Sequence, residues 1–153
     1  MWYTCCMTTV YLDTCSLHRP LDDKSQLRIA VEAEAILAVL SLCETGALSL
    51  ILSAVIQFEV DRNPHPQRKA FVAGILAHAQ QTIGLTDAIE QRAKGLETAG
   101  FKALDALHLA AAEAGRVNYF CTCDDRLLKK AKTRAEIALK VVSPLELAQE
   151  VLP

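Results

Sequence analysis

Short hydrophobic runs alternate with longer helical patterns along the 153 residues of the chain. Apolar runs of this length, bounded by polar or turn residues, are typical of buried strands. They predict strands at 9–12, 48–52, 117–122 and 139–142. The segments between them favour helix, and several are rich in Ala and Leu, which are strong helix formers. Helices are predicted at 23–43, 54–62, 66–81, 86–100, 102–115, 126–132 and from 144 onwards.

Polar residues at the expected helix starts support these boundaries. Asp23 with Gln26, and Ser143 with Glu146, have the spacing of capping boxes. Single residues are expected to cap three other helices: Ser53, Thr86, and either Asp124 or Asp125. The segment 14–22 contains an Arg-Pro pair and is predicted as a loop.

Strands that alternate with helices favour an α/β fold, because parallel strands need crossover connections that cover the faces of the sheet. We therefore predict a mainly parallel central sheet with helices on both faces. The chain length fits one domain, which we expect to span residues 7–153. Residues 1–6 match neither a strand nor a cap and are expected to form a disordered N-terminal extension.

Composition and charge narrow the functional classes. The net charge of −2 argues against a broadly basic nucleic-acid binder but is compatible with a local basic rim. The six cysteines include no Cys-x-x-Cys pair and no zinc-finger spacing, so we expect free thiols in a reducing compartment. The longest uncharged run, 45–58, is too short to span a bilayer, and no signal-peptide pattern is present. We therefore expect a cytoplasmic protein without a membrane partner.

Two acids follow predicted strands. Asp13 lies at the end of the first strand and Asp124 just past the end of a later one. Open α/β sheets bind ligands beyond the carboxyl ends of their strands, so both side chains should reach the same rim. Each also has a structural alternative, since Asp13 could form a turn and Asp124 could cap a helix.

Two further acids lie where a helix should be apolar. Glu59 falls between Val55 and Ile56 on a helical wheel, and Asp105 lies in the first turn of an Ala-rich, apolar helix. A buried carboxylate is costly unless it is paired or bound to a metal. The structural alternatives are a salt bridge from Glu59 to a neighbouring Arg or Lys, and for Asp105 a pairing with Lys102 or with the helix dipole.

Four acids at one rim would repel each other, and a divalent cation relieves that repulsion. Oxygen ligands suit Mg²⁺ or Mn²⁺, and such ions activate water for attack at phosphorus. Because the chain has no Gly-x-x-x-x-Gly-Lys loop, the carboxylates alone would hold the ion. A phosphatase or receiver domain is a weaker interpretation, because no Lys follows the last predicted strand.

Four motifs resemble the PIN-domain ribonucleases, including the VapC-like toxins. They are Val-Tyr-Leu-Asp-Thr at 10–14, Glu59 after Ser53, Leu-Asp-Ala-Leu-His-Leu-Ala at 104–110, and Thr-Cys-Asp at 122–124 followed by Leu127. The resemblance implies a three-layer α/β/α sandwich. It also implies that Asp13, Glu59, Asp105 and Asp124 are the catalytic, metal-binding residues. Cys15 stands where the family often has Ser or an apolar residue, and we expect it to touch no acid.

The resemblance implies a Mg²⁺- or Mn²⁺-dependent endoribonuclease, the toxin of a type II toxin–antitoxin system, with an RNA substrate, a small antitoxin and a homodimer as expected partners. The alternatives are a PIN-like RNA- or protein-binding module without catalysis, and a housekeeping RNA-processing nuclease. Four basic residues are candidates for holding the RNA backbone: Arg19, Arg126, Lys129 and Lys130. His108 is interpreted as a satisfied buried histidine, with a proton shuttle as the alternative.

Overall fold

A sheet of parallel strands forms the centre of the protein, in a computed structural model that describes residues 6–153. The strands run in the order β3-β2-β1-β4-β5, and every pair is parallel. Their bounds are β1 (Thr9–Leu12), β2 (Ser49–Ser53), β3 (Gln81–Ile83), β4 (Tyr119–Cys121) and β5 (Lys140–Val142). Of the expected N-terminal extension, residues 1–5 lie outside the described residues.

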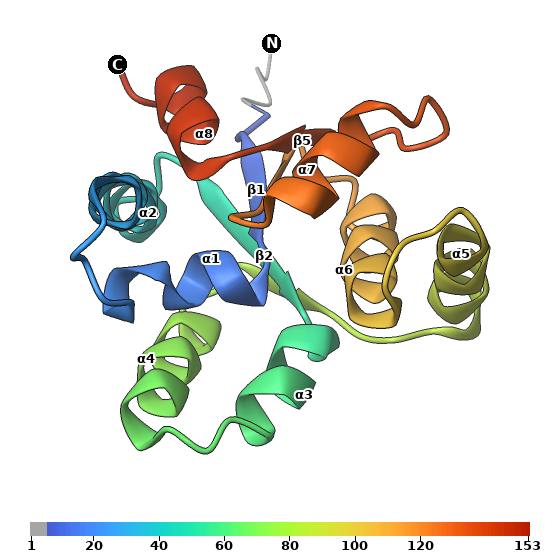
Figure 1. Ribbon diagram of the computed structural model, residues 1–153, viewed down its shortest axis with the longest axis horizontal. Coiled ribbons are helices and arrows are strands. Elements are labelled where there is room, and N and C mark those ends of the chain that lie inside the picture. The colour runs from blue at the N-terminus through green and yellow to red at the C-terminus, as the bar shows by residue number, and fades with distance from the viewer. Residues whose placement is uncertain (1–5) are drawn as a thin grey trace, which may run out of the picture.

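Helices cover both faces of this sheet (Figure 1). They are α1 (Thr14–His18), the 3₁₀ helix η1 (Arg19–Leu21), α2 (Leu27–Glu44), α3 (Ala54–Asp61), α4 (Pro66–Ala77), α5 (Asp87–Thr98), α6 (Ala103–Ala114), α7 (Asp125–Lys132) and α8 (Pro144–Val151). On one face α6 contacts β2 and β3, with α5 packed outside it. On the other, α8 contacts β4 and β5 and packs against α2. The predicted α/β/α arrangement is confirmed.

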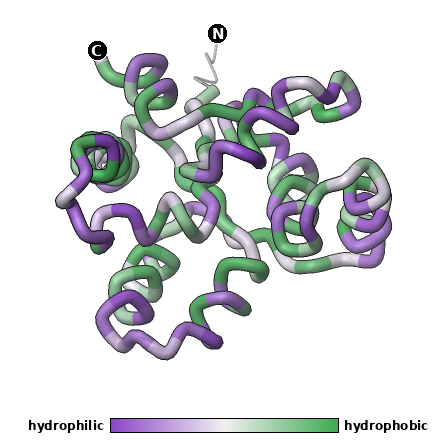
Figure 2. Tube along the Cα trace, in the orientation of Figure 1, coloured by the Kyte–Doolittle hydropathy of each residue, from purple (hydrophilic) through white to green (hydrophobic). Residues whose placement is uncertain are grey.

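The core is centred on β1. Val10, Tyr11 and Leu12 are fully buried, and the Tyr11 ring stacks on Phe120 of β4 with the ring centroids 5.3 Å apart. A strand covered on both faces needs apolar side chains on both sides, which explains why β1 shows no polar alternation. Figure 2 shows hydrophobic residues along the central strands, whereas long hydrophilic stretches lie on the peripheral helices. No helix within residues 6–153 combines the length and apolarity needed to cross a bilayer.

Three of the predicted helix caps are confirmed by the hydrogen bonds. The Thr86 hydroxyl accepts from the backbone N–H of Ile89 at the start of α5. Ser143 and Glu146 form the reciprocal capping box at the start of α8. Asp124, rather than Asp125, caps α7.

Two predictions near the N-terminus are wrong. The segment 14–22 forms α1 and η1 instead of a loop, because Asp13 caps α1 and Pro20 falls in the first turn of η1, where its missing N–H breaks no helical bond. The capping box of Asp23 and Gln26 does not form. Asp23 instead accepts from the N–H of Ser25, and α2 begins at Leu27 without a side-chain cap.

Two further differences depend on tertiary contacts. The helix predicted to reach Gln81 ends at Ala77, and residues 81–83 form the edge strand β3, which pairs with β2. Its three residues are too few to give a strand pattern in the sequence. Ser53 does occupy the N-cap position of α3, but its hydroxyl bonds to Tyr11 instead of capping the helix.

Replacing Gly95 by Ala should stabilise the protein by about 0.5–1 kcal/mol, because glycine within a helix costs roughly that much relative to alanine. Gly95 lies within α5, and no heavy atom lies within 4 Å of the position a Cβ would take. The measurement is the free energy of unfolding in urea.

Gly115→Ala is the matched comparison. A Cβ there would lie 3.2 Å from Ile83 Cδ1 and 3.4 Å from Ile51 Cγ2. Because this crowding opposes the gain in helix propensity, Gly115→Ala should stabilise less than Gly95→Ala. An equal gain at both positions would contradict the packing around Gly115.

Candidate active site

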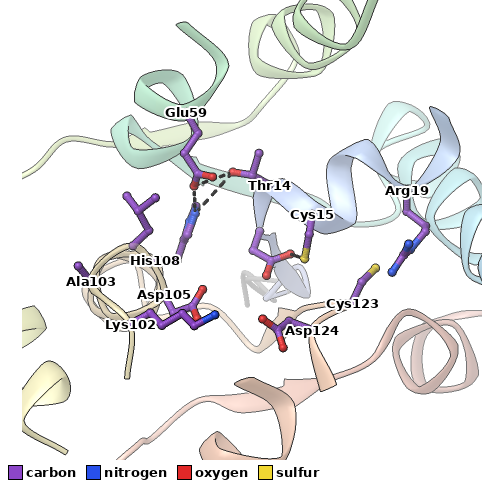
Figure 3. Close-up of a pocket in the computed structure, with 12 residues that line it drawn as sticks. Thr14, Cys15, Arg19, Glu59, Lys102, Ala103, Asp105, His108, Cys123 and Asp124 are labelled. Atoms are coloured by element: carbon purple, nitrogen blue, oxygen red, sulfur yellow. Dashed lines mark hydrogen bonds and ion pairs between the residues drawn. The ribbon is translucent and has the colours of Figure 1, made fainter. Parts of the chain in front are cut away.

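A pocket of about 590 Å³ lies at the carboxyl ends of β1 and β4. All four acids predicted from the sequence line it, and each comes from a different segment (Figure 3). Asp13 follows β1, Glu59 lies on α3, Asp105 lies in the first turn of α6, and Asp124 follows β4. The structure therefore brings these four side chains to one rim, as the sequence predicted.

Asp13 is buried and is held by its Oδ1 atom. This oxygen accepts from the backbone N–H of Ser16 at 3.0 Å and from the thiol of Cys15 at 3.0 Å. The expectation that Cys15 touches no acid is therefore wrong. A hydrogen bond with Cys123, burial and the charge of Asp13 all raise the pKa of the Cys15 thiol, so it stays protonated and can donate. No protein donor among residues 6–153 contacts Oδ2 of Asp13.

Asp124 is positioned in the same way. Its Oδ1 accepts from the backbone N–H groups of Arg126 and Leu127 at 2.9 and 3.3 Å, while its own N–H donates to the Thr122 hydroxyl. Within the described chain these contacts leave Oδ2 of Asp124 without a donor. The structural alternative, a helix cap, is thus correct for Asp124, and Asp13 likewise caps α1. Capping fixes one oxygen of each carboxylate and leaves the other to the pocket.

Asp105 is half-buried and receives no side-chain hydrogen bond or ion pair from the described residues, Lys102 included. Burial, followed by the negative charges of Asp124 and Asp13, raises the pKa of Asp105 above its ordinary value. Its proximity to two other carboxylates is therefore an unfavourable interaction in the protein without a cation. Figure 3 shows Lys102 and Asp105 extending from the start of α6 towards Asp124.

Glu59 is held differently from the three aspartates. Its Oε1 accepts from the Thr14 hydroxyl at 3.0 Å and pairs with Nε2 of His108 (Figure 3). Burial alone would raise the pKa of Glu59, but the hydrogen bonds from His108 and Thr14 bring that pKa below its ordinary value. The structural alternative, a salt bridge from Glu59 to Arg or Lys, is therefore absent among the described residues, and a histidine is the partner instead.

Both ring nitrogens of His108 have partners, as expected for a satisfied buried histidine. Nε2 meets Glu59, and Nδ1 lies 2.7 Å from the Tyr11 hydroxyl, which in turn lies 2.6 Å from Oγ of Ser53. Sequence patterns did not identify Tyr11 and Ser53 as neighbours of the site. The available signal was their position, because Tyr11 precedes Asp13 by two residues and Ser53 opens the helix that carries Glu59.

The predicted RNA-binding residues have different surroundings. Arg19 lines the pocket but pairs with Asp22 at 2.9 Å and Glu32 at 3.6 Å. Lys130 donates to the carbonyl of Gly100 and lies over the Phe101 ring. Arg126 and Lys129 are exposed.

A smaller hollow beside the main pocket places Arg126 next to Asp105 and Asp124. Lys102 lines both hollows and was missed as a candidate for holding RNA. Because Arg126 and Lys102 form no salt bridge within the described chain, they are the cations best placed to bind an anion at this site.

The donor set fits a hard divalent cation. Four carboxylates line the pocket, and each has at least one oxygen that receives no hydrogen bond from the described chain. Asp105 is also under electrostatic repulsion that a cation would relieve. The side chains are not already closed around a centre, because among residues 6–153 no three His, Cys, Asp or Glu side chains lie close enough to hold an ion. Binding would require the carboxylates to move together.

Comparisons with known proteins agree with this geometry. The model of the PIN domain family matches residues 10–133. No curated protein sequence matches the chain. FitAcB from Neisseria gonorrhoeae has a similar solved structure, with a TM-score of 0.60 and 18% identity over 89% of this chain and 98% of that one.

VapBC2 from Rickettsia felis, solved bound to a DNA fragment from their promoter, is also similar, with a TM-score of 0.53 and 14% identity over 89% of this chain and 98% of that one. At these identities the two structures support the fold alone. The family match covers most of the chain, including Asp13, Glu59, Asp105 and Asp124. The protein belongs to the PIN domain family.

Proposed function

We propose that this protein is a metal-dependent endoribonuclease and the toxin of a toxin–antitoxin pair. One observation supports the proposed catalytic activity. Asp13, Asp105 and Asp124 face one pocket at the strand ends, and both other aspartates contribute to the raised pKa of Asp105. A fold without catalysis has no need of such a repulsive arrangement, whereas a site that binds a divalent cation requires it.

The chain supplies oxygen ligands and a proton acceptor. Asp105 and the free Oδ2 atoms of Asp13 and Asp124 are the groups that would hold Mg²⁺ or Mn²⁺. When bound, such an ion lowers the pKa of a coordinated water and neutralises charge on the phosphoryl oxygens. Because the hydrogen bonds to Glu59 fall on Oε1, its Oε2 is left to contact the ion or to accept a proton from the attacking water.

Two cations at the rim would hold the RNA backbone. Lys102 and Arg126 lie beside Asp105 and Asp124, where a phosphodiester must approach for hydrolysis. Their charge also offsets the negative potential that the carboxylates present to a polyanion. Arg19 is already paired, and we assign it a structural role between α1 and α2.

A small antitoxin is the proposed protein partner. A groove of about 400 Å³ between α2 and α4 is lined mainly by apolar side chains, among them Leu37, Leu40, Phe71 and Ile75. An amphipathic helix of a small protein fits such a groove, and the resemblance to VapC-like toxins makes an antitoxin its expected source. A gene for a small antitoxin beside this one would distinguish a toxin from a housekeeping nuclease.

RNA cleavage should require a divalent cation and should be lost in Asp13→Asn and Asp105→Asn. Loss of a ligand should lower the rate by roughly a hundredfold or more, about 3 kcal/mol of barrier. The measurement is cleavage of labelled RNA by the purified protein with Mg²⁺, Mn²⁺ or EDTA. Asp61→Asn is the control, because Asp61 is exposed on α3 outside the pocket and should keep full activity. Undiminished cleavage in EDTA would overturn the proposal.

Asp105→Asn should make the metal-free protein more stable, because it removes like-charge repulsion on the order of 1 kcal/mol per pair. The raised pKa of Asp105 gives the pH dependence. Protonation favours the folded state, so the advantage of Asn should be full above the folded-state pKa. It should fade as the pH falls through that value towards the ordinary carboxyl pKa.

Added Mn²⁺ should reverse this order. The wild type should gain about 2.7 kcal/mol at a hundredfold excess over Kd, and the variant much less. Melting curves in EDTA and in Mn²⁺, with Asp61→Asn as control, provide the measurement. A variant that melts below the wild type in EDTA would mean that Asp105 has a structural partner.

Lys102→Gln with Arg126→Gln should weaken RNA binding and flatten its salt dependence. Two lost phosphate contacts should change the log–log salt slope by about 1.4 on single strands. The control is Lys132→Gln with Lys140→Gln, since these lysines are paired with Glu146 and Glu150 away from the pocket. If both double variants give the same slope, the RNA does not cross this rim.

A further inference from the structure

A buried chain of hydrogen bonds joins three elements that carry the acids of the site. Ser53 stands at the start of α3, Tyr11 lies on β1, and His108 lies on α6. The bonds run from Ser53 Oγ to the Tyr11 hydroxyl at 2.6 Å, and from that hydroxyl to His108 Nδ1 at 2.7 Å. His108 Nε2 then meets Oε1 of Glu59. The chain begins in the core and ends on a carboxylate in the pocket.

The three hydrogen bonds can all run in one direction, with each group donating to the next from Ser53 to Glu59. A carboxylate only accepts, so Nε2 of His108 must donate to Glu59. In a neutral imidazole Nδ1 then accepts, and the Tyr11 hydroxyl must donate to it. A neutral tyrosine hydroxyl carries the proton that this bond needs. Ser53 can in turn donate to Tyr11. The order Ser53, Tyr11, His108, Glu59 thus leaves each group with a partner of the right kind.

Each of these residues lies close in sequence to an acid of the site, which suggests that they position those acids. Tyr11 precedes Asp13 by two residues on β1, His108 follows Asp105 by one turn on α6, and Ser53 opens the helix that carries Glu59. The three side chains are buried, at 0%, 3% and 0% exposure respectively. A hydrogen-bonded group fixed this rigidly can set the position of a functional carboxylate to a fraction of an ångström.

We propose that Ser53, Tyr11 and His108 are positioning residues that hold Glu59 in the orientation its role in the proposed nuclease requires. They fix Oε1 of Glu59 together with Thr14, so that Oε2 faces the pocket. Neither Tyr11 nor Ser53 is among the residues that line the pocket, and His108 lines it next to Glu59. The inference rests on the proposed function for its catalytic consequence, but the hydrogen-bonded chain itself is present without it.

Tyr11→Phe is the principal test. It keeps the ring that stacks on Phe120 and removes only the hydroxyl, so His108 Nδ1 loses its donor. Binding of Mn²⁺ to the intact protein, measured by calorimetry, should weaken by about tenfold to a hundredfold. In RNA cleavage kcat should fall while KM for RNA stays the same, because no RNA contact is removed.

Tyr119→Phe is the matched control. It also removes a tyrosine hydroxyl that makes a side-chain hydrogen bond, here to Glu150, but Tyr119 and Glu150 lie away from the pocket. Mn²⁺ affinity and kcat of this variant should equal those of the wild type. If Tyr11→Phe fails to fold, Ser53→Ala tests the same series of hydrogen bonds at the end farthest from Glu59. It should also weaken Mn²⁺ binding, but by a smaller factor.

Two substitutions of His108 separate positioning from packing. Glutamine can place an N–H near the position of Nε2 and should retain part of the Mn²⁺ affinity. Asparagine reaches only the position of Nδ1, cannot donate to Glu59, and should lose that affinity. Equal affinity in the Gln and Asn variants would mean that His108 only fills space.

The outcomes separate this inference from the proposed function. A wild type that neither binds Mn²⁺ nor cleaves RNA overturns the nuclease proposal. A wild type that does both, with Tyr11→Phe within twofold of it in Kd and kcat, overturns the positioning role alone. A metal-free readout completes the test. Nitrogen NMR of the His108 ring should report the tautomer protonated at Nε2 in both proteins, with the Nδ1 resonance moved in Tyr11→Phe because that atom loses its donor. An unchanged Nδ1 resonance would also overturn the inference.

Discussion

The parallel pairing of β1 with β4 is the constraint on which the site depends. Leu12 is in register with Cys121, and the N–H of Asp13 continues the pairing by donating to the Cys121 carbonyl at 3.2 Å. The two strands therefore end at the same level, and Asp13, directly after β1, lines the same pocket as Asp124, three residues past the end of β4. A shift of one residue in this register would turn the strand side chains to the opposite faces of the sheet.

This placement gathers more negative charge than folding alone would favour. The protein manages the charge in two ways. Glu59 is stabilised as a carboxylate by His108 and Thr14, whereas Asp105 is left close to other acids without a protein donor from the described residues. The first arrangement contributes to stability, and the second opposes it. Sites that oppose stability are expected where function requires them, because the rest of the fold compensates for the cost.

The basic residues also fall into two groups, those paired with acids within the fold and those without such a partner. Many are used within the fold, as in the pairs of Lys132 with Glu146 and Lys140 with Glu150. A net charge near zero therefore says little about where positive charge is available. Lys102 and Arg126, which form no salt bridge within the described chain, lie at the rim beside the acids. Attraction of a polyanion would be local to this rim rather than a property of the whole surface.

The sequence by itself determined the strands β1, β2, β4 and β5, the helices α2 to α8, the four acids and the family resemblance. Its local signals are strong where a strand runs into an acid, as at Asp13, or where a helix has a clear cap, as at Thr86 and Ser143. Only the tertiary structure decided that β3 is a strand, since its three residues become one by pairing with β2. It also decided the partner of Glu59. His108 is 49 residues away in the chain, and a contact between two helices that distant in sequence leaves no local sequence pattern.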